Sequence, residues 1–142
     1  TIADMKAVLL LVALSLGLAS GEPAWCTCAP FVSFEHSEIM VYNSHETTIN
    51  DCVNDVNACR NYCKNYFGTT TNNGDLWFYT SGNTVGGHLC DYVFKNDLMP
   101  FLMHKTVHGY YQVCGGAWRY GEVSSSEALC CELGEQTHCT EL

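Results

Sequence analysis

TINDCVNDVNACRNYCKNYF, residues 48–67, is the segment of this chain with the clearest structural signal. Apolar and cysteine side chains recur in it at alternating spacings of three and four residues, at Ile49, Cys52, Val56, Cys59, Cys63 and Tyr66. This spacing places these side chains on one face of an α-helix. Thr48 with Asp51 predicts an N-terminal cap, and Gly68 is placed to end the helix. We therefore predict one long, cysteine-bearing helix over about residues 48–67.

Two cysteines upstream match the spacing of two cysteines in this helix. Cys26 and Cys28 flank a single residue, so on a β-strand they face the same way, about 6.6 Å apart. Cys59 and Cys63 are one helical turn apart, which separates their Cα atoms by about 6 Å. A strand laid along the helix can therefore form both bridges with ordinary disulfide geometry. We predict that these two strand cysteines are bonded to these two helix cysteines.

All ten cysteines lie downstream of residue 21, and their even number predicts a framework of five disulfides with no free thiol. A zinc site would require paired Cys-x2-Cys motifs, and the chain has none. The vicinal residues Cys130 and Cys131 point in different directions, so they suit two separate partners. The cysteines expected in disulfides are Cys26, Cys28, Cys52, Cys59, Cys63, Cys90, Cys114, Cys130, Cys131 and Cys139.

A secretory signal peptide is predicted over residues 5–21 and indicates a secreted, extracellular protein. Lys6 is followed by a run of apolar or small residues, and Ala19 and Gly21 occupy the −3 and −1 positions of a cleavage site. The apolar run is shorter than the ~20 residues that a transmembrane helix needs. No later stretch is long or apolar enough, so no membrane span is expected.

Residues 1–4 precede Met5 and are interpreted as translated upstream sequence, which leaves residues 22–142 as a single disulfide-stabilised secreted domain. The chain of 142 residues carries 15 Asp and Glu against 6 Lys and Arg, a formal net charge of −9. This charge argues against nucleic acid as a partner, because phosphates require Lys and Arg. The hydrophobic content of 47% argues against a disordered acidic tail.

Turn and capping signals divide the rest of the domain into short elements. Ser124 with Glu127 forms a capping-box pattern and Gly134 follows, which predicts a short C-terminal helix over about residues 125–133. Gly86-Gly87 is interpreted as a turn. Strands are expected over residues 30–34, 39–42, 76–80, 89–94 and 107–113. The predicted fold class is a small disulfide-rich α+β domain with short antiparallel strands.

The sequence contains no recognisable catalytic set. Its size and its cysteine-bearing helix are similar to those of secreted phospholipases A2, but Val56 and Asn57 stand where that family has its His–Asp pair. His104 and His108 lack the intervening Glu of a metalloprotease motif, and no Gly-x-Ser-x-Gly elbow is present. We therefore expect a protein that is not an enzyme.

The C-terminal segment is acidic, with five Glu and no Lys or Arg after Arg119. Carboxylates are hard oxygen ligands, so weak calcium binding is predicted, with Glu132 and Glu135 as the candidate ligands. The alternative is a solvated acidic face that keeps the protein in solution. No other cofactor is expected.

Aromatic residues are abundant, with 3 Trp, 8 Tyr and 6 Phe. A set of them could line a carbohydrate-stacking surface, although packing in the core is the more frequent role of large rings. The set consists of Trp25, Trp77, Tyr79, Tyr110, Tyr111, Trp118 and Tyr120.

The predicted signal peptide, the expected bridges and the Glu-bearing tail resemble, in general type, small acidic Cys-rich secreted proteins of invertebrates, including those of mollusc shell matrices. The resemblance implies a non-enzymatic matrix or structural component, of a calcified matrix such as shell. Its implied partners are extracellular matrix components or a mineral surface. The alternative is a secreted effector such as a toxin or a protease inhibitor, because disulfide scaffolds are common there too. Toxins that act on membranes are usually basic, however, and this chain is acidic.

Overall fold

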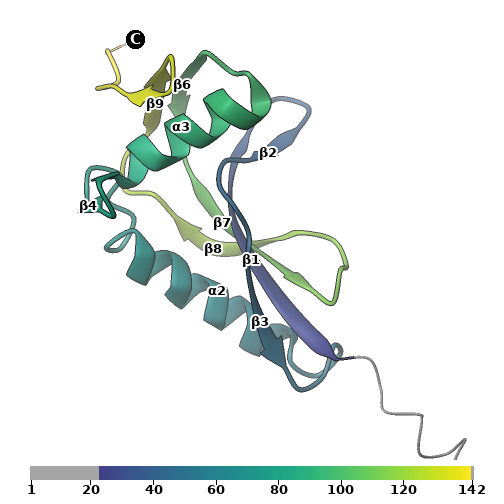
Figure 1. Cartoon of the computed structure of the whole chain (residues 1–142). Coiled ribbons are helices and arrows are strands. Elements are labelled where there is room, and N and C mark those ends of the chain that lie inside the picture. The colour runs from purple at the N-terminus through teal and green to yellow at the C-terminus, as the bar shows by residue number, and fades with distance from the viewer. Residues whose placement is uncertain (1–22, 142) are drawn as a thin grey trace, which may run out of the picture.

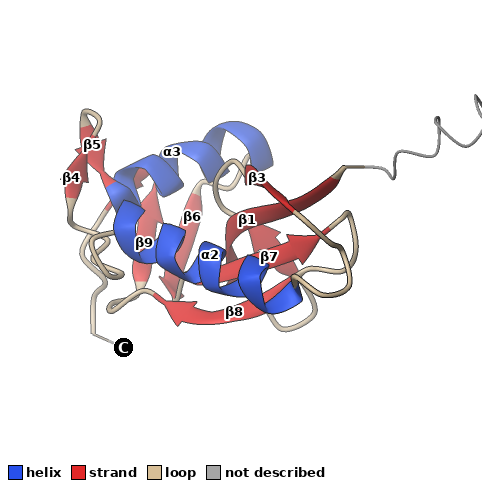
Figure 2. Cartoon of the chain, turned by 90° about the horizontal axis from the view of Figure 1, so that it is seen from below, coloured by secondary structure: helices blue, strands red, loops and turns tan. Residues whose placement is uncertain are grey.

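The computed structural model describes residues 23–141, so the expectations for residues 1–4 and for the signal peptide over residues 5–21 lie outside the described residues. The described chain combines two helices with antiparallel strands (Figures 1 and 2). The helices are α2 (Val56–Thr70) and α3 (Val85–Asp97). The strands are β1 (Ala24–Ser33), β2 (Glu38–Met40), β3 (His45–Ile49), β4 (Tyr79–Thr80), β5 (Asn83–Thr84), β6 (Phe101–Lys105), β7 (His108–Val113), β8 (Arg119–Ser124), β9 (Leu129–Glu132) and β10 (Glu135–Gln136). The predicted α+β class is confirmed.

Strand β1 is the centre of the largest sheet, whose order is β2-β1-β7-β8 with β3 also beside β1. Residues 24–28 of β1 pair with β3, and residues 31–33 pair with β2. Pro30 falls between these two pairings, and its carbonyl accepts a hydrogen bond from the N–H of Val41 at 2.9 Å. Because proline has no N–H to donate, a junction between two partner strands is a position where a sheet tolerates it. The expected strands over 30–34, 39–42 and 107–113 thus overlap β1, β2 and β7, whereas the one over 76–80 overlaps only β4.

Helix α2 packs against β1, β7 and β8 through one buried face (Figure 2). The buried residues of the helix are Cys59, Cys63 and Phe67, which recur every four residues. Two of them are bonded to β1, in the disulfides Cys26–Cys59 and Cys28–Cys63, with Cα atoms 5.5 and 5.2 Å apart. This is the pairing predicted from the matched spacing. It joins the central strand covalently to the long helix at two adjacent points.

Helix α2 starts later and ends later than the predicted range of about residues 48–67. The first two residues of that range belong to β3. The carboxylate of Asp51 then accepts hydrogen bonds from the N–H groups two and three residues later, at 2.6 and 2.7 Å, and that of Asp55 accepts from the N–H of Asp51 at 3.0 Å. Short polar side chains that bond nearby backbone in this way hold a turn and compete with helix formation. Cys52 is consequently exposed, off the predicted helical face, and is bonded to Cys114.

The other end of α2 also differs from the expectation. Gly68 lies within the helix instead of ending it. The last turn is closed by Thr71, whose N–H donates to the carbonyl of Phe67 at 3.0 Å. Asn72 and Asn73 follow with φ values of 49° and 63°. Asparagine is the residue after glycine that adopts this left-handed conformation most readily, so it takes the role predicted for the glycine.

Helix α3 overturns two expectations, the turn at Gly86-Gly87 and the strand over residues 89–94. The side chain of Thr84 caps this helix by accepting a hydrogen bond from the N–H of Gly87 at 2.9 Å. The two glycines have a packing role: a Cβ on Gly86 would lie 2.2 Å from the side chain of Gln136, and one on Gly87 would lie 2.2 Å from that of Asn83. The glycines therefore let the β4–β5 hairpin and β10 approach the helix closely.

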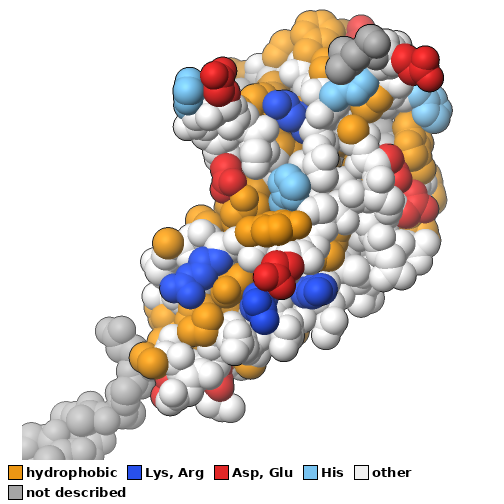
Figure 3. Space-filling view, turned by 180° about the vertical axis from the view of Figure 1, so that it is seen from behind, with side chains coloured by type: hydrophobic (Ala, Val, Ile, Leu, Met, Phe, Trp, Pro, Cys, Tyr) orange, Lys and Arg blue, Asp and Glu red, His pale blue; other side chains and the backbone are white. Residues whose placement is uncertain are grey.

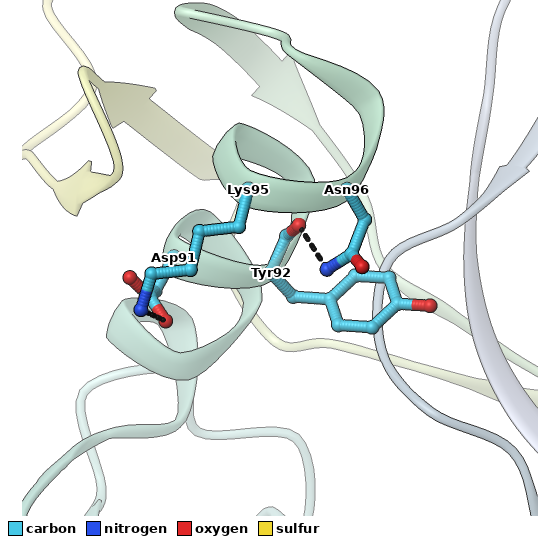
Figure 4. A network of polar contacts seen from close by, with 4 residues as sticks. All are labelled: Asp91, Tyr92, Lys95 and Asn96. Carbon is cyan, nitrogen blue, oxygen red and sulfur yellow. Dashed lines mark hydrogen bonds and ion pairs between the residues drawn. The ribbon is translucent and has the colours of Figure 1, made fainter.

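The outer face of α3 is polar and carries local contacts (Figure 4). Lys95 pairs with Asp91 at 2.9 Å, one turn away. The side-chain amide of Asn96 donates to the carbonyl of Tyr92 at 2.8 Å. Between residues 23 and 141, neither helix has the length and apolar character to span a bilayer.

The predicted C-terminal helix over residues 125–133 is wrong, since residues 129–132 form β9. Leu129, Cys130 and Cys131 are all buried, and three consecutive buried residues suit a strand covered on both faces better than one helical stripe. The carboxylate of Glu127, expected to cap the helix, instead accepts a hydrogen bond from the N–H of Leu76. The adjacent cysteines have separate partners, as predicted: Cys131 is bonded to Cys90 of α3 and Cys130 to Cys139.

Three buried clusters build the core. The largest joins α3, β6 and β9 to the ends of β1 and α2, and contains Leu76, Val93 and Leu129. The second surrounds the two disulfides between α2 and β1. The third, around Phe31 and Tyr110, lies on the sheet away from α2. The clusters meet around a cavity.

Candidate binding pocket

A cavity of about 480 Å³ lies between the two helices and the central strands β1 and β7. Its lining also includes the segment between β2 and β3 and the β4–β5 hairpin. Elements distant in the sequence therefore converge on one space. Its volume lies within the roughly 300–1,000 Å³ that is typical of sites for small molecules.

The floor of the cavity is apolar. Val85 and Leu89 stand four residues apart on α3, and Cys63 and Phe67 four apart on α2, so each helix turns one face toward the cavity. The Cys28–Cys63 disulfide forms part of the wall. The buried lining residues are Cys28, Ala29, Cys63, Phe67, Thr71, Leu76, Val85, Leu89, Val107, Gly109 and Tyr110.

The rim of the cavity is aromatic and polar. The imidazole of His45 stacks on the ring of Tyr66, with centroids 4.3 Å apart and planes 8° from parallel. His45 Nε2 is also 2.9 Å from the hydroxyl of Tyr62, which fixes the imidazole from a second side. The exposed lining residues mark where the cavity meets solvent; they are Tyr42, Asn43, Ser44, Thr69, Thr70, Phe78 and Ser81.

A second histidine, His88, faces the cavity from α3. Its Nε2 lies 2.8 Å from the carbonyl oxygen of Thr80. A carbonyl can only accept, so Nε2 carries the proton, and in the neutral ring Nδ1 is an acceptor. The ring of Tyr42 approaches His88 edge-on, with centroids 6.4 Å apart.

The cavity lining contains no Asp, Glu, Lys or Arg. Burial, and then the proximity of Tyr62 and Tyr42, raise the pKa of the Tyr66 phenol above its usual range, so this hydroxyl stays un-ionised near neutral pH. The walls, which are part of the described chain, therefore contain no pair of carboxylates. An apolar floor with neutral polar groups at the rim suits the binding of a small molecule.

All ten cysteines fall within residues 23–141 and form five disulfides, with no free thiol among them. Two groups have the composition of a metal site, namely Cys26 with Cys28 and Cys63, and His104 with Cys130 and Cys139. Every sulfur in them belongs to a disulfide, and a disulfide sulfur is not the thiolate that zinc requires. These groups are therefore structural.

The two calcium candidates lie in the β9–β10 hairpin. Glu132 and Glu135 are paired across the two strands, and both are exposed. Among the residues that the structure describes, neither joins a group of three potential ligand atoms. Calcium takes six to eight oxygen ligands. Weak calcium binding by Glu132 and Glu135 stays a prediction.

The aromatic residues considered for a stacking surface are dispersed. Tyr111 is buried beneath α2 beside the two disulfides. Trp77 stacks on His138, with centroids 4.3 Å apart. The rings of Tyr110 and Tyr120 lie together, with centroids 5.9 Å apart, and Trp118 packs against the cluster that contains Tyr110. Tyr110 is also the one member of the set that lines the cavity. Seen from behind, the molecule carries charged side chains of both signs among apolar ones (Figure 3).

The sequence did not predict the pocket, although it named one lining residue, Tyr110, as a candidate for a stacking surface. Tyr66 was placed on a helical face, but His45 and Tyr42 were assigned to no site. His88 and Leu89 line the cavity only because α3 is a helix, and α3 was not predicted. The chain matches no family model, no curated protein and no solved structure.

Proposed function

We propose that this protein acts outside the cell as a non-enzymatic binding protein and holds a small molecule in the cavity between α2 and α3. The observation that carries the proposal is the cavity itself, of about 480 Å³. An apolar floor and a rim with a few fixed polar groups are the usual features of a small-molecule site. The histidines on the rim are engaged with Tyr62 and Thr80, so they serve to shape the opening.

We also propose that the protein is exported from the cell. The five disulfides are compatible with an oxidising compartment, in which such bonds form and persist. The apolar segment over residues 5–21 has the pattern of a signal peptide. Deposition in an extracellular matrix, as the general resemblance implies, and release as a secreted effector are the two settings in which the protein would act. Proteomics of secretions and of insoluble extracellular matrices distinguishes them by the fraction in which the native protein is found.

Binding is tested with the disulfide-bonded protein and N-phenyl-1-naphthylamine, an uncharged dye whose fluorescence rises in apolar surroundings. We expect saturable binding to the native protein. The variant Ser44→Trp places a large ring at an exposed position on the rim and should weaken dye binding at least about tenfold, or by about 1.4 kcal/mol. Ser37→Trp is the matched control, because Ser37 is exposed and lies outside the cavity lining. Absence of dye binding, or equal binding by both variants, would contradict the proposal.

A further inference from the structure

We propose that the ligand is an uncharged amphiphile, bound with its apolar body against the floor and its neutral polar end at the rim, and that ionised analogues are rejected. This inference rests on the proposed function and specifies the ligand class of the same pocket. It follows from three properties of the lining: the floor is apolar, and the side-chain hydroxyl of Thr71 there is already hydrogen-bonded; the rim carries neutral polar groups; and no Asp, Glu, Lys or Arg is present.

The floor offers a ligand almost only apolar contact. The apolar surface that stays accessible there comes from residues such as Phe67, Val85 and Leu89, with exposed fractions of 6%, 8% and 5%. The nearby hydroxyl of Thr71 is already engaged: it donates to the carbonyl of Phe67 at 2.6 Å and accepts from the N–H of Gly74 at 2.7 Å. A polar group pushed to the floor would therefore lose its hydration without gaining a partner, whereas a hydrocarbon or ring would gain burial.

The hydroxyl of Thr70 is similarly engaged, since it donates to the carbonyl of Tyr66 at 2.7 Å. The polar groups that a ligand can reach include those of the exposed rim, namely the hydroxyls of Tyr42, Ser44, Thr69 and Ser81 and the amide of Asn43. These are neutral donors and acceptors, which suit a hydroxyl, amide or ether oxygen. The polar end of the ligand therefore belongs at the rim.

Charge decides between neutral and ionised ligands. A carboxylate or ammonium that entered the cavity would be desolvated, and no Asp, Glu, Lys or Arg lines the walls to compensate it. The formal net charge of −9 adds long-range repulsion of anions. The same negative charge and the aromatic rim would draw a cation toward the opening, but inside the cavity an ammonium would lose its hydration with no carboxylate in the lining to compensate it. A neutral polar end avoids the cost of desolvating a charge that has no partner in the cavity.

The test compares three probes with the same twelve-carbon chain, 1-dodecanol, dodecanoate and dodecylammonium, as competitors of the bound dye at pH 8. We expect the alcohol to displace the dye at a concentration at least about tenfold lower than either ion. If dodecanoate or dodecylammonium displaces the dye as well as 1-dodecanol does, the proposed ligand class is wrong, although the pocket still binds a small molecule. Failure of the dye itself to bind overturns the proposed function.

A rim variant gives a second, independent readout. Ser44→Lys places an ammonium beside the position assigned to the polar end, so the affinity for dodecanoate should rise at least about tenfold while that for dodecanol changes little. Ser37→Lys adds the same charge at an exposed position outside the cavity and should leave both affinities unchanged. An equal gain in both variants would show that net charge, and not the rim, controls selection. Intact mass and near-ultraviolet circular dichroism check that the variants keep five disulfides and the native fold.

Discussion

The imidazole of His45 lies flat on the phenol ring of Tyr66, and this stack joins the start of β3 to the long helix at the rim of the cavity. Tyr62 lies one turn earlier on the same helix, and its hydroxyl completes the contact at 2.9 Å. The rim is thus held by a strand that pairs only with β1. Loss of this contact should affect the pocket before it affects the rest of the fold.

Replacing His45 with Ala removes both the stack and the hydrogen bond. We expect the free energy of unfolding to fall by about 1–2 kcal/mol, as measured by urea denaturation. Tyr62→Phe removes the hydrogen bond alone and should cost only about 0.5–1 kcal/mol. If Tyr62→Phe is as destabilising as His45→Ala, the stack on Tyr66 contributes nothing and this account is wrong.

Two disulfides that close loops of different length should contribute differently to the free energy of unfolding. Cys52–Cys114 joins residues 62 apart, and Cys130–Cys139 joins residues 9 apart. In the chain-entropy model, removal of the first bridge as a double alanine variant costs about 4 kcal/mol, and removal of the second costs about 2.5 kcal/mol. Chemical denaturation of the two double variants measures the difference. The reverse order would mean that native packing, and not loop closure, dominates.

Two glycines should respond to alanine in opposite directions. A Cβ on Gly121 would lie 2.8 Å from the backbone oxygen of Gly109 on the neighbouring strand, so Gly121→Ala should destabilise the protein by about 1–3 kcal/mol. Gly68 lies within α2, and its nearest contact would be a side-chain oxygen of Asn73 at 3.4 Å. Gly68→Ala should therefore stabilise by up to about 1 kcal/mol, because alanine favours the helix. Thermal unfolding of both variants tests the signs, and a stabilising Gly121→Ala would refute the close approach of β7 and β8.

Stability should decline at alkaline pH because of Tyr110. Burial, and then the hydrogen bond that its hydroxyl donates to Glu38, raise the pKa of Tyr110 to about 12. An unfolded tyrosine titrates near pH 10, so the folded protein holds this proton more tightly. The resulting stability is complete below about pH 10 and is lost as the pH rises toward about 12. The pH slope of the unfolding free energy in this window should be smaller in Tyr110→Phe; an unchanged slope would assign the decline to other groups.

The disulfide pairing of α2 could be predicted because it depends on two local spacings, Cys26 to Cys28 and Cys59 to Cys63, that match in length. The start of α2 could not be predicted. The helical spacing of apolar and cysteine side chains continues upstream of the helix, through a turn held by Asp51 and Asp55. Side-chain to backbone bonds of this kind leave no trace in a hydrophobic pattern. They can be recognised only as a weak tendency of Asp and Asn to interrupt helices.

The pocket could not be predicted because it depends on contacts between distant segments. Gly86 and Gly87 have the composition of a turn, and only the proximity of Gln136 and Asn83 explains why a helix needs them. Without that helix, the rim residues Tyr42 and His45 have nothing opposite them. The fold class could be predicted from local sequence signals, whereas prediction of the binding site would have required the tertiary structure.

The adjacent residues Cys130 and Cys131 bond in opposite directions, to the C-terminal segment and to α3. A shift of β9 by one residue would turn each thiol toward the other's partner and would carry buried Leu129 to the wrong face. During oxidative folding, therefore, the register of β9 against β6 is what distinguishes two neighbouring thiols. Oxidation before this strand docks would give scrambled isomers at these two positions. Their repair would require thiol–disulfide exchange with an attacking thiolate, so efficient maturation depends on the order of docking and oxidation.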